Sequence, residues 1–132
     1  MIGSTRTGKL MIGGILVSFV ILRASLYLSP AADFYVAGYN IHHLFSGILI
    51  AILCLLPLVI VRPKGRKGAA LAFFSGIGLG MMLDEWVYLI VTDGSNASYL
   101  LPVSFWGGLA MVLVCVAYIL LLVRLAHLRT PK

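Results

Sequence analysis

Four apolar runs, each about as long as a helix that crosses a bilayer, constrain the fold of this chain more than any other feature. They cover approximately residues 10–28, 40–61, 68–92 and 99–123. A helix of about 20 apolar residues spans the hydrocarbon core, and it satisfies its backbone hydrogen bonds internally, as lipid requires. Hydrophobic residues make up 61% of the chain and charged residues 11%, which excludes an ordinary soluble domain. We therefore predict an all-α fold, a four-helix transmembrane bundle, as a single integral membrane domain over residues 1–132.

The basic residues lie at the ends of these runs in a pattern that predicts the orientation of the bundle. Of ten Lys and Arg residues, two precede the first run, four lie between the second and third, three follow the fourth, and the remaining one is Arg23. The other two connections have no Lys or Arg, and their charged residues are Asp33 and Asp93. Because basic residues favour the cytoplasmic side, we expect both termini to be cytoplasmic in a multi-pass protein of the plasma (inner) membrane. The connections are short, so consecutive helices are expected to pack as antiparallel neighbours.

The net charge of +6 does not indicate a nucleic-acid partner. The basic side chains flank apolar runs and lack the aromatic interleaving of a nucleic-acid surface. Anionic headgroups of membrane lipids are the expected partners, and assembly into a homo-oligomer or a larger membrane complex is left open.

Two adjacent carboxylates, Asp84 and Glu85, are the acidic residues inside the apolar runs. A carboxylate in lipid is costly, so each must be compensated. Arg23 of the first run can neutralise one of them through a charge-assisted pair. The other needs a proton, a protonated histidine or a bound cation, and desolvation favours the protonated form of a carboxyl group. The sequence therefore leaves room for proton or metal chemistry at this position without requiring it.

Polar side chains from all four runs fall at a similar depth. At ~1.5 Å of rise per residue, the ionisable residues inside the first three runs lie within roughly 12 Å of the outer boundary, and Ser104 enters at the same level. The inner half of the bundle has no Asp, Glu, His, Lys or Arg. Ionisable groups inside a membrane mark a functional site by default. The predicted binding residues are Arg23, His42, His43, Asp84, Glu85 and Ser104.

Less specific interpretations of the same residues remain open. Arg23 and one carboxylate could form a structural ion pair, and the two histidines could be interfacial residues bonded to an outer loop. The expected interfacial anchors are Trp86, Tyr88, Tyr99 and Trp106. Gly76 and Gly80 form a small-xxx-small pair, which favours close helix packing over ligand access.

A divalent metal ion is a candidate cofactor, because imidazole and carboxylate groups are common metal ligands. Neighbouring residues on a helix point about 100° apart, so one chain is expected to supply one histidine, one carboxylate and a water. A complete site would then need both members of a pair or a second subunit. The candidate metal ligands are His42, His43, Asp84 and Glu85.

Two motifs follow one another in the second and third runs: His42-His43-x-x-x-Gly47 and Gly76-x-Gly-x-Gly80-x-x-x-Asp84-Glu85. This combination resembles small multi-pass membrane proteins of prokaryotes that carry an HH-type motif followed by a glycine-rich segment ending in Asp-Glu. Those proteins have no assigned activity. The resemblance covers about half of the chain. It implies four to six membrane helices and no particular reaction, and it favours the pairing of His42 or His43 with Asp84 or Glu85.

These observations support three hypotheses for the function. The first is a binding protein whose polar site, in the outer-leaflet third of the bundle, takes a cation, a proton or a lipid headgroup. The second is a metal-dependent membrane enzyme that acts on a lipid-borne substrate, with Asp84 or Glu85 as general base. The third is a structural or accessory subunit of a larger membrane complex, in which the polar cluster holds the helices together. The sequence favours the first hypothesis.

Overall fold

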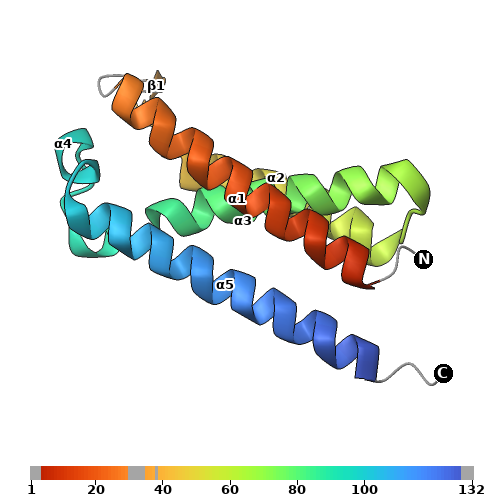
Figure 1. Ribbon diagram of the computed structural model, residues 1–132. Helices are drawn as coiled ribbons and strands as arrows, with labels where there is room; N and C mark the ends of the chain where they lie inside the picture. Colours follow the sequence, from red (N-terminus) through yellow and green to blue (C-terminus); the bar gives the residue numbers. More distant parts are fainter. Residues whose placement is uncertain (1–3, 30–34, 38, 129–132) are drawn as a thin grey trace.

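Four long helices make up most of the structure, a computed structural model that describes residues 4–29, 35–37 and 39–128 (Figure 1). Each is long and apolar enough to cross a membrane, in agreement with the predicted all-α, four-helix membrane fold. The described part also contains an antiparallel ribbon of two short strands and a single-turn helix. In chain order the elements are α1 (Ser4–Leu28), β1 (Tyr35–Val36), β2 (Tyr39–Asn40), α2 (His43–Ile60), α3 (Gly65–Val91), α4 (Asn96–Tyr99) and α5 (Pro102–Leu128).

The fourth membrane helix begins later than the sequence predicts. We expected it to begin near Tyr99, but Tyr99 is the last residue of α4, and α5 begins at Pro102. A proline disfavours helical backbone in the residue before it but suits the first position of a helix, where its missing N–H has no partner to lose. The chain therefore turns between the two helices. The other predicted spans, 10–28, 40–61 and 68–92, overlap α1, α2 and α3 and differ from them at the ends.

Helix α3 lies at the centre of the bundle, and the other three long helices pack against it (Figure 1). Helices α1 and α5 also contact each other. Helices α1 and α2, although consecutive, have little or no contact along their described lengths. The prediction that consecutive helices pack as neighbours is therefore wrong for this pair, because both use α3 as their partner. The buried hydrophobic core lies among α1, α3 and α5 and consists of Ile15, Phe19, Leu83, Val112 and Ile119.

Glycines allow α3 to approach its neighbours closely. A Cβ atom at Gly76 would collide with the backbone carbonyl group of Met11 in α1. A Cβ atom at Gly47 of α2 would lie 2.7 Å from the carbonyl oxygen of Gly78. Small residues in such positions bring helix backbones into contact in membrane proteins. The packing interpretation of the glycine-rich segment is therefore confirmed.

Large apolar side chains cover the outward faces of α2 and α5. Leu53 of α2 and Val114 of α5 are more than half exposed, as are many of their neighbours. Such extended apolar faces are suited to contact with lipid tails.

The two ends of the bundle differ in charge. The start of α1, the α2–α3 connection and the end of α5 lie at one end, and the strand ribbon and α4 lie at the other (Figure 1). A hydrogen bond between Thr5 and His127 joins α1 and α5 at the first end. Asp33, Arg129 and Lys132, on which the predicted orientation partly depends, lie outside the described residues. The described basic residues at the first end are Arg6, Lys9, Arg62, Lys64, Arg66, Lys67 and Arg124.

Candidate functional site

Arg23 and Asp84 form a buried ion pair in the part of the bundle nearest α4. The Nε atom of Arg23 lies 2.6 Å from Asp84 Oδ1, and the two residues are 5% and 0% exposed. The guanidinium group also donates to the carbonyl oxygen of Ser104 at 2.9 Å and to its hydroxyl group at 3.3 Å. The ion pair therefore joins α1, α3 and α5 at one point, and Arg23 points into the bundle rather than towards lipid.

The surroundings of this ion pair are tightly packed and partly aromatic. The guanidinium carbon of Arg23 lies 4.6 Å from the centroid of the Tyr99 ring, within the range of a cation–π contact. Gly108 of α5 leaves space for the pair, because a Cβ atom there would lie 3.0 Å from Arg23 Nη2 and 3.1 Å from Asp84 Oδ1. Throughout the described residues, every buried side-chain nitrogen and oxygen has a hydrogen-bond partner. Asp84 is thus both neutralised and fully hydrogen-bonded.

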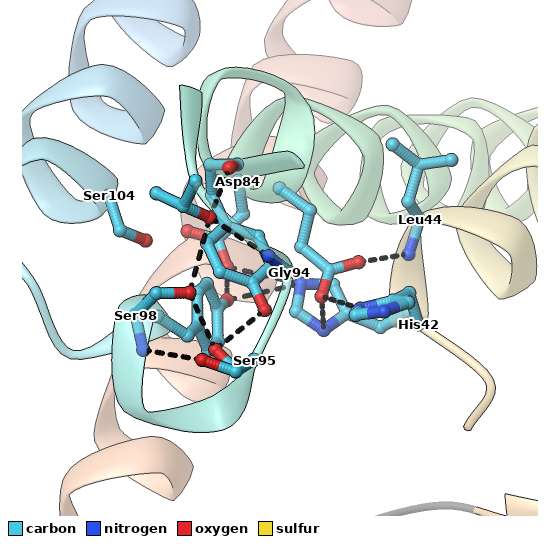
Figure 2. Close-up of polar contacts among 12 residues, drawn as sticks. His42, Leu44, Asp84, Gly94, Ser95, Ser98 and Ser104 are labelled. Atoms are coloured by element: carbon cyan, nitrogen blue, oxygen red, sulfur yellow. Dashed lines mark hydrogen bonds and ion pairs between the residues drawn. The ribbon is translucent and has the colours of Figure 1, made fainter. Parts of the chain in front are cut away.

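Glu85 follows Asp84 directly but faces α2. Its Oε2 atom accepts a hydrogen bond of 2.8 Å from the Leu44 backbone N–H, and its Oε1 atom lies 3.1 Å from His42 Nδ1. The Leu44 N–H belongs to the first turn of α2, where free N–H groups and the helix dipole favour a negative charge. None of the Lys and Arg residues in the described ranges forms an ion pair with Glu85. Figure 2 shows the Leu44 nitrogen and the His42 ring on one side of the cluster and Ser104 on the other.

His43 lies between the two carboxylates. Its Nε2 atom is 3.1 Å from Asp84 Oδ2, and its Nδ1 atom is 3.4 Å from Glu85 Oε1. The side chains of His42 and His43 are 21% and 20% exposed, and both face the cluster. The expectation that adjacent histidines diverge is wrong here, because His42 precedes the helix. It is the N-cap residue of α2 and has extended backbone, with φ −61° and ψ 140°, so the 100° spacing of a helix does not apply to it.

Tyr99 belongs to the same cluster, which we did not expect from the sequence. Its hydroxyl group donates to Asp84 Oδ2 and lies 3.2 Å from His43 Nε2. Burial, together with the adjacent Asp84 carboxylate, raises the pKa of Tyr99, so the hydroxyl keeps its proton and acts as a donor. Tyr99 and Tyr88 are 8% and 1% exposed, so neither is the interfacial anchor that the sequence predicted. The depth of Tyr99, at the start of the predicted fourth run, was the one sign that it could join the other site residues.

Hydrogen bonds around Ser95 hold α4, and with it Tyr99, against the cluster (Figure 2). The Ser95 hydroxyl caps α4 by accepting from the Ser98 N–H at 3.3 Å, as serines commonly do at this position. The Tyr88 hydroxyl donates to the Ser95 carbonyl oxygen at 2.9 Å, and the Ser98 hydroxyl donates to Thr92 Oγ1 at 3.2 Å. The connection between α3 and α5 is therefore fixed by its own polar groups.

The four candidate metal ligands lie close together but are paired with one another. His42 contacts Glu85, and His43 contacts both carboxylates. In the part of the chain that the structure describes, no group of three or more His, Cys, Asp or Glu side chains is arranged to hold a metal ion. Metal binding stays a prediction from the sequence, and we do not assign these residues as metal ligands.

All the residues predicted to bind a ligand therefore meet in one cluster, together with Tyr99 and the Leu44 backbone. No protein-family model, curated protein sequence or solved structure matches the chain. The fold and the cluster define a small four-helix membrane protein with a buried group of ionisable side chains. What this group does must be argued from its own geometry and charge.

Proposed function

We propose that this protein binds a cationic ligand, in the simplest case a proton, at the cluster around Glu85. The ligand supplies the positive charge that Glu85 lacks. An inorganic cation or the ammonium group of a lipid headgroup belongs to the same chemical class. The cluster brings together side chains from α1, α3, α4 and α5 and the N-terminal turn of α2.

The observation that carries this proposal is that the Glu85 carboxylate has no permanent counter-charge among the described residues. Arg23 forms an ion pair with Asp84, with 2.6 Å between Nε and Oδ1. The partners of Glu85 are instead two imidazoles and one backbone N–H. The Glu85 side chain is only 4% exposed, and an unpaired buried carboxylate is expensive. A cationic ligand that binds reversibly would supply the missing counter-charge of this carboxylate.

The position of the cluster supports an opening towards the outer leaflet of the plasma (inner) membrane. The cluster lies near α4, at the end of the bundle opposite to the described basic residues outside it (Figure 1). Basic residues collect on the cytoplasmic side of membrane proteins. We therefore propose that the ligand reaches the cluster from the extracytoplasmic side and that both termini are cytoplasmic.

The dependence of stability on pH tests this proposal. Glu85→Gln keeps the shape of the side chain and removes its charge. If a proton is the ligand, the stability of the wild-type protein is expected to depend on pH more steeply than that of the variant, because a proton bound only in the folded state links folding to pH. The variant is expected to show a flatter profile. Thermal unfolding of purified protein in detergent micelles, with a chelator present to remove divalent ions, measures both profiles.

Added cations identify the ligand class in the same assay. Sodium or ethanolamine is expected to restore wild-type stability at high pH only if a cation larger than a proton binds there. If wild type and Glu85→Gln have parallel profiles in pH and in every added cation, the cluster has a purely structural role and the proposal is wrong.

A further inference from the structure

The α2–α3 connection and the adjoining outward face of α2 form a second surface, at the end of the bundle opposite to the cluster (Figure 1). The proposed function does not use it. We infer that this surface binds one anionic phospholipid, with the headgroup phosphate at the connection and an acyl chain along α2. The assignment depends on the unpaired positive charge of the connection and on the length of the apolar face beside it, and not on what binds at Glu85.

Positive charge is concentrated in the connection and has no compensating acid. Four exposed basic residues occur within six consecutive positions: Arg62, Lys64, Arg66 and Lys67. None of them forms an ion pair with a described acidic residue. Arg62 is partly occupied, because its Nε donates to the Val59 carbonyl oxygen at 3.2 Å. The other three side chains are therefore the available partners for an anion.

The position of these three residues makes their charge unfavourable in the protein alone. Lys64 is the N-cap residue of α3, and Arg66 and Lys67 lie in its first turn, which contains no acidic residue. The helix dipole already places partial positive charge at this terminus, so the three side chains add to it. A phosphate group accepts charge-assisted hydrogen bonds from such cations and offsets both sources of positive charge. Gly65 leaves the backbone open to it, since a Cβ atom there would meet no other described part of the protein within 4 Å.

An exposed apolar stripe on α2 ends beside this charge. Residues three or four positions apart share one face of a helix, and four such residues of α2 are 54–74% exposed: Leu49, Leu53, Leu56 and Ile60. From Leu49 to Ile60 the helix rises roughly 16 Å at ~1.5 Å per residue, and one leaflet of a ~30 Å hydrocarbon core is about 15 Å thick. The stripe therefore matches the depth of one acyl chain, whose phosphate would lie at the level of the basic residues.

A phospholipid fits both parts of this surface, whereas the alternatives fit only one. A free phosphate ion would use the basic residues and leave the stripe uncovered. A second copy of the chain, in the same orientation in the membrane, would place its own basic connection against this one, and such like charges oppose association. Charge complementarity and length together therefore favour an anionic lipid.

Native mass spectrometry of the full chain, released from non-ionic detergent micelles, measures the headgroup preference. The probes are phosphatidylglycerol and phosphatidylcholine with the same acyl chains. Wild-type protein is expected to bind phosphatidylglycerol at least about tenfold more tightly, because each Lys or Arg near an anionic headgroup adds to the attraction. The variant Lys64→Gln/Arg66→Gln/Lys67→Gln is expected to lose most of this preference.

The matched control is Arg6→Gln/Lys9→Gln/Arg124→Gln, which removes three exposed charges from the same end of the bundle and is expected to keep the preference. Equal losses in the two triple variants would show a diffuse attraction to positive charge and would overturn the inference. Equal affinities of wild-type protein for the two lipids would overturn it as well. So would displacement of phosphatidylglycerol by an equal concentration of inorganic phosphate, which would indicate a site for the free ion.

Photolabelling of wild-type protein tests the position of the acyl chain without any variant. The probe is a phosphatidylglycerol that carries a diazirine in one acyl chain, at low mole fraction in phosphatidylcholine nanodiscs. Label is expected mainly between Leu49 and Ile60 of α2, and an excess of unlabelled phosphatidylglycerol should prevent it. Exposed apolar residues of α5 such as Val114, which is 65% exposed, provide the internal reference for bulk lipid. Label spread evenly over α2 and α5 would overturn the inference.

Discussion

Asp84 and Glu85 are consecutive in the chain, but their surroundings differ in kind. Asp84 is completely buried, and its carboxylate contacts Arg23 of α1, His43 of α2 and Tyr99 of α4. The partners of Glu85 all belong to the N-terminal turn of α2 and its cap. Because adjacent residues on a helix point about 100° apart, one carboxylate enters the centre of the bundle and the other enters a single helix interface.

This difference indicates that Asp84 has a fixed structural role, whereas the charge of Glu85 can be compensated in more than one way. Asp84 has a permanent cation, and its partners come from several elements, so it fixes their relative positions. Glu85 has no permanent cation among the described residues, and its side-chain partners are two imidazole rings. Two acids that look equivalent in the sequence thus have different surroundings, and the proposed function assigns ligand binding to Glu85.

The largest expected loss of stability follows from substitution of Asp84. Asp84→Asn leaves the Arg23 guanidinium buried without its counter-charge, which typically costs about 3–5 kcal/mol of unfolding free energy. Glu85→Gln is expected to cost roughly half as much or less, because no described Lys or Arg pairs with Glu85 and none therefore loses its counter-charge. Chemical unfolding in mixed micelles at neutral pH measures both values.

A double variant provides the control for this comparison. Arg23→Met combined with Asp84→Leu removes both charges and is expected to recover much of the loss, because buried ion pairs can often be replaced by apolar side chains at little cost. If Asp84→Asn and Glu85→Gln lost equal amounts of unfolding free energy, the two acids would not differ in their structural role.

A smaller effect is expected when one donor is removed from the Asp84 side alone. Tyr99→Phe deletes the hydroxyl group that donates to Asp84 Oδ2, and hydrogen bonds to charged groups typically contribute about 1.5–3 kcal/mol. Tyr118→Phe on α5 is the matched control, since Tyr118 is 58% exposed and its change should be within about 0.5 kcal/mol. The pH dependence assigned to Glu85 should persist in Tyr99→Phe. The division of roles would be weakened if that dependence disappeared together with the hydroxyl.

The smallest expected loss of stability follows from filling the space beside the Arg23–Asp84 ion pair. Gly108→Ala would press a methyl group against Arg23 and Asp84 at 3.0–3.1 Å, and such overpacking typically costs about 1–3 kcal/mol. The better helix propensity of alanine offsets up to about 1 kcal/mol, so a net loss near 1 kcal/mol is expected in thermal unfolding. Gly13→Ala, where the nearest atom would be 3.9 Å away, should be neutral or stabilising. A stabilising Gly108→Ala would mean that the pair has room to move.

The apolar runs and the depth of the polar residues could be predicted from the sequence because both depend only on helix rise and bilayer thickness. Depth alone places Arg23 and the two acids at one level. It does not show which partner each carboxylate takes, since that depends on helix rotation. Helix rotation in turn follows from close contacts such as those at Gly76 and Gly47.

Tyr99 and His42 could not be placed for a different reason. Both lie just outside the long helices, where backbone conformation is set by local capping and turns rather than by periodicity. His42 has extended backbone as an N-cap residue, and Tyr99 ends a one-turn helix held by Ser95. Short irregular segments next to a membrane helix therefore supplied the parts of the cluster that helix geometry missed.

Helix α2 packs mainly on α3 and has little contact with the rest of the bundle. It also supplies every hydrogen-bonding partner of Glu85, whereas the Arg23–Asp84 pair connects α1, α3 and α5 without it. A tilt of α2 away from α3 would withdraw both imidazoles from Glu85 in a single motion and leave the three-helix frame intact. The surroundings of Glu85 therefore depend on the position of a single helix.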